Sequence, residues 1–352
     1  MSLSQISITN LRCIQQAELE VPAGFTLIWG GNGSGKTSIL EAVFLLGRGR
    51  SFRTRNTERL IARGQDHLRV VGRIEVGSRG ATTIGLELGA GDVTARIGGR
   101  TAGSLAELSQ AFPVQVIEPG VHRLVEEGGQ GRRRWLDWAV FHVEPNFVLH
   151  WQSYSRALRQ RNAALKSNAD PTLWDGELAR LGDMLTASRA RLIDSLQPYW
   201  AGALQDLNAE PVTLTFFPGW SREYTLSAAL TAHLLKDRER GSTSSGPHRF
   251  DVMLRLDHHP VRDVVSRGQQ KLLGAAMALT MSRYISDATG RTPTLLLDDP
   301  AAELDQSHTE SMLSAVRKLG GQLVVTALRV GDTPLGTPDR VFHVEQGGLK
   351  RL

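Results

Sequence analysis

The sequence predicts an α/β fold with a helical segment inserted into it, and three patterns support this prediction. A short apolar run at 25–29 is typical of a buried strand, and it leads through glycines into an apolar stripe typical of a helix at 39–47. Segments 70–76 and 83–88 alternate apolar with other residues, which indicates an antiparallel meander with Gly-rich turns. Between 147 and 192, apolar residues instead recur with helical spacing.

The helical segment is expected to form two antiparallel helices that make a short arm or lobe. The first series consists of Phe147, Trp151, Tyr154, Leu158 and Leu165, and Arg161 takes the remaining seam position. After a turn at 167–171 the rhythm repeats with Trp174, Leu178, Leu181, Leu185 and Leu192. The heptad-like spacing favours a paired arm. Two amphipathic core helices are the alternative.

The β/α pattern returns after residue 245. The expected elements there are an alternating strand at 250–256, a helix at 272–284, and apolar strands at 294–297 and 322–326. The sequence therefore predicts a core domain in two halves, 1–118 and 206–352, with the helical arm or lobe inserted at 119–205. A chain of 352 residues is long enough for such a core plus one further unit.

Composition excludes several classes of protein. Hydrophobic residues make up 41% and charged residues 22% of the chain, which is ordinary for a soluble globular protein. The longest apolar run, 272–281, is half the length that a membrane helix needs, and the N-terminus shows no export signal. A single cysteine, Cys13, excludes an intrachain disulfide. The sequence predicts a reduced, cytoplasmic protein without membrane association.

The basic residues are unevenly distributed. Lys+Arg number 41 against 36 Asp+Glu, a formal charge of +5, and 35 of the 41 are arginine. Genome base composition explains such a bias as readily as function does. Segment 48–63, however, carries six arginines with Glu58 as its sole acid. These are Arg48, Arg50, Arg53, Arg55, Arg59 and Arg63. Such a cluster is an electrostatic footprint for nucleic acid.

Segment 30–37 matches the pattern G-x-x-x-x-G-K-[ST] between a predicted strand and a predicted helix. Glycines allow the backbone to turn its N–H groups toward an anion at the helix N-terminus. The expected nucleotide-binding residues are Gly30, Gly31, Asn32, Gly33, Ser34, Gly35, Lys36, Thr37 and Ser38. Lys36 is expected to reach the β- and γ-phosphates of ATP, and the Thr37 hydroxyl to hold Mg²⁺.

A phosphate loop of this kind also needs an acid for the metal. The apolar strand at 294–297 delivers Asp298 and Asp299 at its C-terminal end, where ligands bind in open α/β sheets. We expect Asp298 to hold Mg²⁺ through water. Asp299 is the candidate catalytic residue, together with Lys36, because it could orient or deprotonate the attacking water.

A third motif indicates the class of ATPase. Ser266, Arg267, Gly268 and Gln269, followed by a helix, resemble the signature sequence of ABC-class ATPases, and 302–305 resembles the loop that follows the metal-binding strand in that class. The signature would form a second anion site at a helix N-terminus. In that class it faces the nucleotide of the other subunit. The resemblance implies an ABC-type head, with a mixed sheet and an antiparallel β subdomain, and an ATP-dependent homodimer.

Six segments together resemble the RecF family of bacterial recombination mediators, which is related to the head domains of SMC and Rad50 proteins. They are 8–12, 31–38, 50–54, 132–137, 246–251 and 266–269, so the resemblance covers essentially the whole chain. Gly246-Pro247-His248-Arg249 is among the most specific of them. The resemblance implies ATP-dependent DNA binding without base readout and weak, DNA-stimulated ATP hydrolysis. It also implies partnership with RecR and RecO, loading of RecA at single-strand gaps and a part in the SOS response.

The sequence departs from the expected motifs at several places. Gln115 and Glu118 are both candidates for the residue that corresponds to the Q-loop glutamine of transporter ATPases. Thr326 stands where those enzymes usually have a histidine, and Asp299 stands where many ABC ATPases have glutamate, which fits slow hydrolysis. Phe250 replaces an expected acid. Asn10 and Arg12 are candidates for adenine contacts by position only.

Two alternative functions share these motifs. The ATP-binding subunit of a membrane transporter has the same loop, signature and metal-binding strand, but it usually also has the histidine. A structural SMC or Rad50-like head would carry a long coiled-coil insertion. The 125 or so residues between 121 and 245 are too few for a long rod.

Overall fold

The computed structural model describes residues 1–77, 80–89, 91–300, 304–332 and 335–351. The chain divides into two compact units. Unit 1 contains 1–122, 202–209 and 267–352, and unit 2 contains 123–201 and 210–266.

The division between the units differs from the one expected at 205/206. Segment 210–266 was assigned to the core domain, but it belongs to unit 2. The reason is strand pairing: β10 (Asp251–Leu256) pairs antiparallel with β9 (Thr213–Phe217) and with β11 (His259–Pro260), and these strands form a separate sheet. The predicted strand at 250–256 therefore exists, but it does not extend the core sheet.

The first sheet of unit 1 is antiparallel throughout and has six strands in the order β2-β1-β4-β5-β6-β7. The strands are β1 (Ser2–Leu11), β2 (Ile14–Glu20), β4 (His67–Glu75), β5 (Ala81–Gly89), β6 (Val93–Ile97) and β7 (Arg100–Thr101). Alternate residues such as Leu68 and Val70 are fully buried on one face. This is the predicted meander, and it confirms the period-two pattern.

The second sheet of unit 1 also has six strands, in the order β15-β14-β3-β13-β12-β8. They are β3 (Phe25–Trp29), β8 (Val114–Ile117), β12 (Thr294–Leu297), β13 (Leu323–Ala327), β14 (Arg340–Glu345) and β15 (Gly348–Arg351). All neighbouring pairs are parallel except β14 with β15. The carboxyl ends of β3, β13, β12 and β8 therefore meet at one edge, where such sheets bind ligands.

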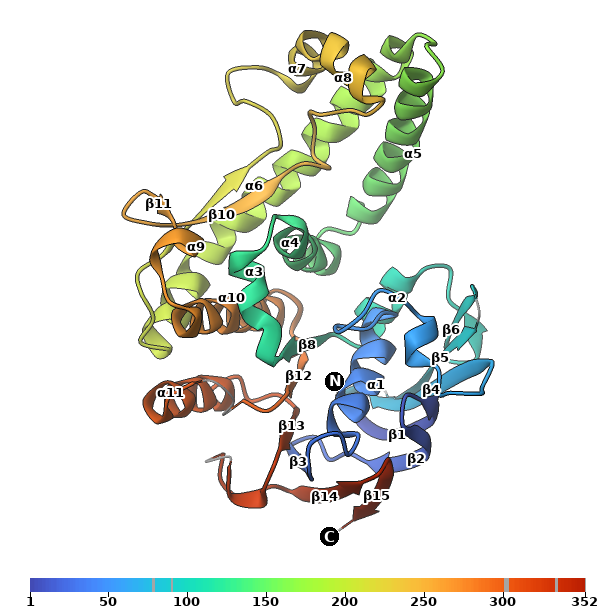
Figure 1. Cartoon of the computed structure of the whole chain (residues 1–352), viewed down its shortest axis with the longest axis vertical. Helices are drawn as coiled ribbons and strands as arrows, with labels where there is room; N and C mark the ends of the chain where they lie inside the picture. The colour runs from blue at the N-terminus through green and yellow to red at the C-terminus, as the bar shows by residue number, and fades with distance from the viewer. Residues whose placement is uncertain (78–79, 90, 301–303, 333–334, 352) are drawn as a thin grey trace. The chain divides into compact units, whose positions relative to one another are not determined.

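Helices cover both faces of the second sheet (Figure 1). Helix α1 (Lys36–Arg48) packs between the two sheets, and its residues Leu40 and Val43 belong to the main hydrophobic core. Helices α10 (Arg267–Thr289) and α11 (Gln306–Arg317) cover the opposite face. The apolar run at 272–281 is buried over its whole length. The other helical elements in the described part of unit 1 are α2 (Leu105–Ala111), the 3-10 turns Glu58–Leu60, Pro119–His122 and Val330–Asp332, and 202–206, the end of a helix that begins in unit 2.

Unit 2 is built around two helices that run in opposite directions, α5 (Phe147–Lys166) and α6 (Asp175–Asp206), of which residues 175–201 belong to this unit (Figure 1). Helix α5 contains the whole first series. Helix α6 contains the second series from Leu178 to Leu192 and continues well past it, whereas Trp174 lies in the 3-10 turn before α6. The other helices are α3 (Arg123–Glu126), α4 (Gln130–Val143), α7 (Leu226–Ala232), α8 (Leu234–Arg240) and α9 (Val261–Val264), with a 3-10 turn at Pro171–Trp174. Gly182 of α6 lies against Leu226 of α7 and against Pro247, so the helix packs on more than its predicted partner.

Arg161 occupies its predicted seam position as a fully buried cation. Its Nε donates to Asp175 Oδ1 at 2.7 Å, at the start of α6. Its Nη1 donates to Asp237 Oδ2 of α8 at 2.8 Å and to Thr243 Oγ1 at 2.9 Å. The side chains of Arg161 and Asp237 are both 0% exposed. Two carboxylates thus explain why an arginine stands at a seam position where the other residues of the series are apolar. Through them Arg161 connects three segments of unit 2.

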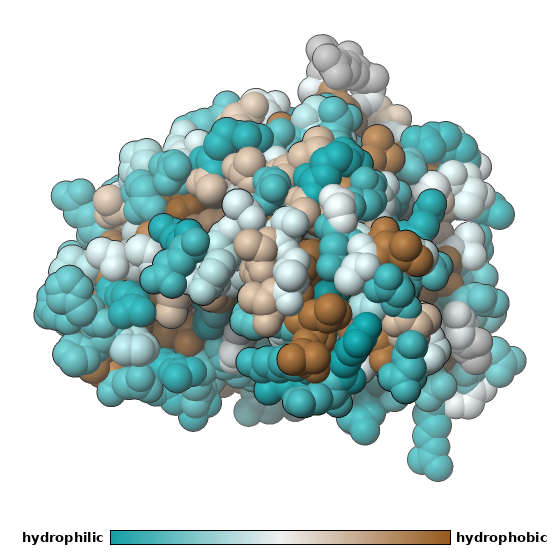
Figure 2. All heavy atoms as spheres, turned by 90° about the horizontal axis from the view of Figure 1, so that it is seen from above, coloured by the Kyte–Doolittle hydropathy of each residue, from teal (hydrophilic) through white to brown (hydrophobic). Residues whose placement is uncertain are grey.

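The surface seen from above is mostly hydrophilic, and its apolar side chains form small separate patches (Figure 2). Patches of this size are normal on globular proteins. Among the residues that the structure describes, no helix combines the length and the apolar character that crossing a bilayer requires.

We predict that Arg161→Ala strongly destabilises the protein. The substitution leaves Asp237 as a buried carboxylate without its ion-pair partner, which costs about 3–5 kcal/mol of the free energy of unfolding. Urea unfolding followed by circular dichroism measures the loss. Arg180→Ala is the matched control, because the pair of Arg180 with Glu177 is exposed on both sides and contributes little. Equal stability of the two variants would contradict the prediction.

Candidate functional site

The predicted phosphate loop connects β3 to α1 and is braced by two distant turns. Gly33 and Gly35 have φ values of 76° and 117°, which favour glycine. A Cβ atom on Gly35 would lie 3.1 Å from Cys13 Sγ, in the turn between β1 and β2. Gly347, in the turn between β14 and β15, donates its backbone N–H to Ser34 O at 2.8 Å. The loop therefore has a fixed shape that is set by its surroundings.

The loop can hold an anion. Helix α1 starts at Lys36 without a side-chain cap and without an acid in its first turn, so its first N–H groups remain available. Lys36 Nζ folds back and donates to Gly30 O at 2.9 Å and to Gly31 O at 3.0 Å. The buried Ser34 Oγ has no hydrogen-bond partner among the described residues. These donors suit phosphate oxygens.

Asp298 lies beside the loop, as the sequence predicts. It follows β12 directly, and its carboxylate Oδ1 accepts a hydrogen bond from Thr37 Oγ1 at 3.0 Å. The two groups expected to hold Mg²⁺ are thus within contact distance, although 261 residues separate them in the sequence. Asp298 is 6% exposed.

Thr326, at the end of β13, completes this junction. Its Oγ1 donates to Asp298 Oδ1 at 2.8 Å and accepts the backbone N–H of Asp299 at 2.9 Å. Burial raises the pKa of Asp298, and the hydrogen bonds from Thr326 and Thr37 oppose that rise. Transporter ATPases usually have a histidine at this position. In this chain Thr326 stands there and orients both aspartates.

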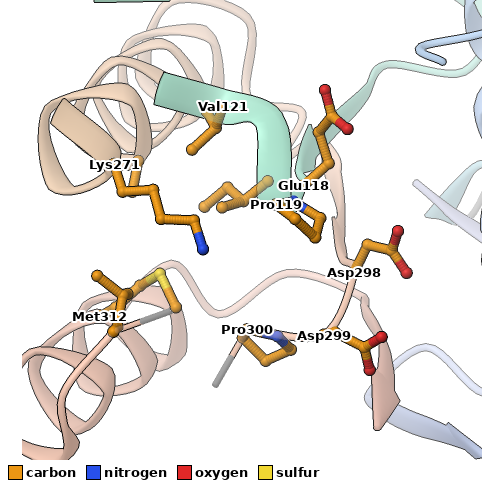
Figure 3. A pocket seen from close by; sticks show the side chains of 11 residues that line it. Glu118, Pro119, Val121, Lys271, Asp298, Asp299, Pro300 and Met312 are labelled. Atoms are coloured by element: carbon orange, nitrogen blue, oxygen red, sulfur yellow. The ribbon is translucent and has the colours of Figure 1, made fainter. Parts of the chain in front are cut away.

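Asp299 has an unusual backbone conformation. Its φ is 43°, in the left-handed region that a non-glycine residue rarely adopts. Thr326 holds the Asp299 N–H in this conformation. Asp298 and Asp299 lie on the same side of the pocket in Figure 3. Such strained backbone is common at functional sites.

A small pocket adjoins the two aspartates (Figure 3). Its lining includes Glu118 and Pro119 after β8, Lys271 of α10, and Met312 of α11. Lys271 is 5% exposed, and its side chain reaches from α10 toward the middle of the pocket. The helix that carries the signature motif thus contributes a buried cation to the wall of a pocket that Asp298 also lines.

The structure distinguishes Gln115 from Glu118, the two candidates for the glutamine of transporter ATPases. Gln115 lies inside the strand and is buried, and its Oε1 accepts from Arg48 Nη2 at 3.1 Å. Glu118 comes immediately after the strand, beside Asp298, whose N–H donates to Ile117 O at 2.9 Å. Only Glu118 of these two reaches the edge where the phosphate loop and Asp298 meet.

The two candidates for adenine contacts are held by other groups. The Arg12 guanidinium forms a bidentate pair with the fully buried carboxylate of Glu41, which also accepts from Ser51 Oγ. Asn10 Nδ2 donates to Gln65 Oε1 and His67 O, both at 3.3 Å. These contacts link the turn after β1 to α1 and to the segment that follows it.

The signature residues stand at the start of α10, as predicted. Ser266 and Arg267 are exposed, and Gly268 and Gln269 are half-buried in the first turn of the helix. Ser266 directly precedes the helix, where a hydroxyl can cap or bind an anion. In the loop predicted at 302–305, residues 302 and 303 lie outside the described residues.

The residues present fit Mg²⁺ bound together with a nucleotide. Mg²⁺ prefers hard oxygen ligands and usually keeps waters and phosphate oxygens in its shell. Thr37 Oγ1 and the Asp298 carboxylate supply two such oxygens side by side. No cluster of three or more His, Cys, Asp or Glu side chains able to hold a metal occurs in the described part of the chain. The donor set therefore suits a metal that arrives with phosphates.

Sequence reasoning missed the roles of Thr326 and Lys271. Thr326 has no motif of its own, and its signal is a hydroxyl at the end of the strand next to the one that delivers Asp298. Lys271 gave a weaker signal: it is a lysine immediately before the longest apolar run of the sequence.

Comparison with known proteins places this chain in a family. The family "RecF/RecN/SMC N terminal domain" matches residues 2–347. The "DNA replication and repair protein RecF" of Thioalkalivibrio sulfidiphilus is 38% identical over 357 residues, covering 99% of both chains. The protein of the same name from Xanthomonas axonopodis pv. citri is 39% identical over 367 residues, covering 100% of this chain and 99% of the relative.

Solved structures agree with the sequence relatives. The "recombination mediator protein RecF-ATP in RecFOR pathway" superposes with a TM-score of 0.90 at 25% identity, covering 99% of this chain and 97% of that chain. An Smc head bound to the C-terminal winged-helix domain of ScpA has a TM-score of 0.58 at 14% identity, covering 100% of this chain and 98% of that chain, and shares the fold. The predicted ABC-type head with an antiparallel β subdomain and a helical unit is confirmed.

We predict that Asp298→Asn stabilises the nucleotide-free protein at pH 7. Burial raises the pKa of Asp298 above its ordinary value of 3.8, so ionisation costs folding stability once the pH exceeds that value. Asparagine removes the charge and keeps Oδ1 for both threonines. Thermal unfolding should show a gain at pH 7 that shrinks toward pH 4. A variant less stable than the wild type at pH 7 would refute this.

Proposed function

The chain belongs to the RecF family of DNA replication and repair proteins, and from this premise we propose that it is an ATP-driven DNA-binding switch of recombinational repair. The observation that carries the proposal is the junction of Thr37 with Asp298. It brings the phosphate loop and the metal-binding strand within 3.0 Å of each other, which is the arrangement that binding a nucleoside triphosphate with its metal requires.

ATP binding is assigned to the loop from Gly30 to Ser38. The free N–H groups at the start of α1 hold the phosphates, and the Lys36 ammonium moves from the loop carbonyls to the β- and γ-phosphates. Mg²⁺, held by Thr37 and by Asp298, neutralises phosphate charge when it is bound. Asp299 orients or deprotonates the attacking water, and Thr326 fixes the backbone from which its carboxylate projects.

Slow hydrolysis follows from the same residues. Aspartate is one methylene shorter than the glutamate usual in ABC ATPases, and Thr326 cannot act as a proton carrier in the way that a histidine can. Glu118, which lies beside Asp298, is the better candidate for a residue that senses the nucleotide than Gln115. The slow hydrolysis of ATP thus sets how long the protein stays bound to DNA, and DNA stimulates this hydrolysis.

The functional unit is a homodimer with ATP at its interface. The exposure of Ser266 and Arg267 at the start of α10 supports this part of the proposal, because an anion site at a helix N-terminus is then open to a second molecule. Ser266, Arg267, Gly268 and Gln269 of one copy contact the γ-phosphate held by Lys36 and Thr37 of the other.

The partner of this dimer is DNA, bound through its backbone. Arg53, Arg59 and Arg63 are exposed in the Arg-rich segment of unit 1. Arg48 is excluded, because its guanidinium is bound to Val114 O at 3.0 Å and to Gln115. Arginine side chains suit phosphates, and no motif for base readout is present, so duplex or gapped DNA is recognised by structure.

The proposed place of this protein is at single-strand gaps, with RecR and RecO, where it helps to load RecA. The similarity to a structure titled for the RecFOR pathway supports that setting. Neither alternative function is favoured. The curated relatives are repair proteins over their full length, and unit 2 is too short for the rod of an SMC protein.

We predict that Lys36→Met abolishes ATP binding, and with it dimer formation, because the phosphates lose their main cation. Ser266→Arg should bind ATP normally but remain a monomer, since the signature acts on the partner's nucleotide. Thermal shift with Mg-ATP measures binding, and sedimentation velocity measures the oligomeric state. If Ser266→Arg still dimerises with ATP, the shared-site arrangement is wrong.

We further predict that DNA affinity in the presence of Mg-ATP falls steeply with salt. Each phosphate neutralised by a cationic side chain releases counterions, so the logarithm of the binding constant declines linearly with the logarithm of salt concentration. Fluorescence anisotropy of labelled gapped duplex measures the slope. A nearly flat dependence would exclude a surface that contacts phosphates.

A further inference from the structure

The turn at 246–250 in unit 2 has no role in the function proposed so far, yet its backbone is tightly constrained. Gly219 and Gly246 have φ values of 104° and 138°. A Cβ atom on Gly219 would lie 2.2 Å from Gly246 O, and a Cβ atom on Gly246 would lie 2.5 Å from Tyr154 Oη. The N–H of Arg249 donates to Gly246 O at 2.8 Å and closes the turn.

His248 is fixed at both ring nitrogens. Its Nε2 lies 3.0 Å from Thr243 O, and its Nδ1 lies 2.8 Å from Tyr154 Oη. Burial lowers the pKa of His248 to about 4, so the ring is neutral at pH 7. A neutral ring donates from Nε2 to the carbonyl and accepts the tyrosine O–H at Nδ1, which satisfies both contacts.

A buried arginine holds the next part of the turn. Arg189 of α6 is fully buried, and its Nη1 donates to Pro247 O at 2.8 Å. Its Nε and Nη2 form a bidentate pair with Asp137 of α4 at 2.8 and 3.0 Å. The same guanidinium lies 3.9 Å from the ring centroid of Phe250, which is 1% exposed. Phe250 therefore replaces the expected acid as a packing partner for this cation.

Two further arginines hold the end of the turn from α4. Arg132 forms a bidentate pair with Asp251, with both distances 2.9 Å. Arg133 Nη1 donates to Phe250 O at 3.0 Å. On both sides of Arg249, backbone and side chains are thus held by buried or half-buried partners.

Arg249 itself is the exception. Its side chain is exposed, and it makes no hydrogen bond or ion pair with the described residues. An exposed arginine normally loses much backbone and side-chain freedom when it binds a ligand. The backbone of Arg249 is already ordered in the folded protein, so ligand binding costs less conformational entropy here. This favours a role of Arg249 in binding.

The charge around Arg249 is not balanced. The two nearby acids are already engaged, Asp251 by Arg132 and Asp137 by Arg189. Arg133 lies close to Arg249, because its Nη1 donates to the carbonyl oxygen of the next residue, Phe250, at 3.0 Å. Burial is the largest cause that lowers the pKa of Arg133; Asp251 opposes this, and the charge of Arg249 lowers the pKa further. The arginines at this turn, Arg132, Arg133, Arg189 and Arg249, thus outnumber the two acids that are paired there.

We propose that Arg249, presented by this fixed turn next to Arg133, binds a phosphate of the DNA backbone. The inference rests on the proposed function, because it identifies one place where unit 2 contacts the DNA. A guanidinium offers a planar fork that matches phosphate oxygens. A turn at which arginines outnumber acids favours a polyanion over a single carboxylate as the ligand.

The test compares Arg249→Gln with the wild type for binding of a labelled gapped duplex in Mg-ATP, at several salt concentrations. We expect about a tenfold loss of affinity. The slope of log affinity against log salt should decrease by about 0.9, the loss of one phosphate contact. Arg249→Lys keeps the charge, so it should retain the wild-type slope with a smaller loss of affinity.

Arg180→Gln is the matched control, because it removes one exposed positive charge from unit 2 at a residue already paired with Glu177. It should leave the affinity and the slope unchanged. Melting temperature and Mg-ATP binding of Arg249→Gln should equal those of the wild type, since the side chain makes no described contact.

Two outcomes overturn this site specifically. One is wild-type affinity and slope in Arg249→Gln. The other is loss of Mg-ATP-dependent dimerisation in Arg249→Gln without DNA, which would show that Arg249 binds a carboxylate of a second copy. Failure of the wild type itself to bind the duplex in Mg-ATP would instead refute the proposed function together with this site.

Discussion

The site depends on one buried carboxylate that accepts two threonine hydroxyls. Asp298 Oδ1 receives Thr37 Oγ1 at 3.0 Å and Thr326 Oγ1 at 2.8 Å, so a single oxygen ties the start of α1 to the ends of β12 and β13. Burying a carboxylate is unfavourable, and these hydrogen bonds offset part of that cost. The same arrangement keeps a negative charge next to the phosphate loop, where a metal ion can compensate it. Folding stability and ligand binding thus make opposite demands on Asp298.

Contacts within unit 1 relate the nucleotide site to the helix that carries the signature motif. Lys271 of α10 and Glu118 after β8 line one pocket with Asp298 and Asp299. Side chains from α10 and from two neighbouring strand ends therefore share one environment. Lys271 lies one helical turn after Arg267, so the helix that begins with the signature motif also lines the pocket of the two aspartates.

The sequence was informative where structure is local. Three elements each depend on a short run of residues: the phosphate loop, the strand before Asp298 and the start of α10. Their backbone conformation is set locally by glycines, by apolar residues and by a capping residue, respectively. It was uninformative where contacts join distant segments. The strand at 250–256 has the same alternating pattern whichever sheet it joins, and its pairing with β9 placed 210–266 in unit 2. Arg161 broke an apolar series, and its two acidic partners come from separate helices. The contact of Thr326 with Asp298 depends on the order of strands in the sheet, which no local pattern encodes.

The order of strands in the second sheet also has a consequence for biosynthesis. Strand β3, which delivers the phosphate loop, lies between β13 and β14, and the loop is braced by the N–H of Gly347. A ribosome makes the loop long before it makes both flanking strands and the brace. During translation the loop therefore lacks the neighbours that fix its shape. The loop therefore acquires its final shape only once β13, β14 and Gly347 have been synthesised and have packed around β3.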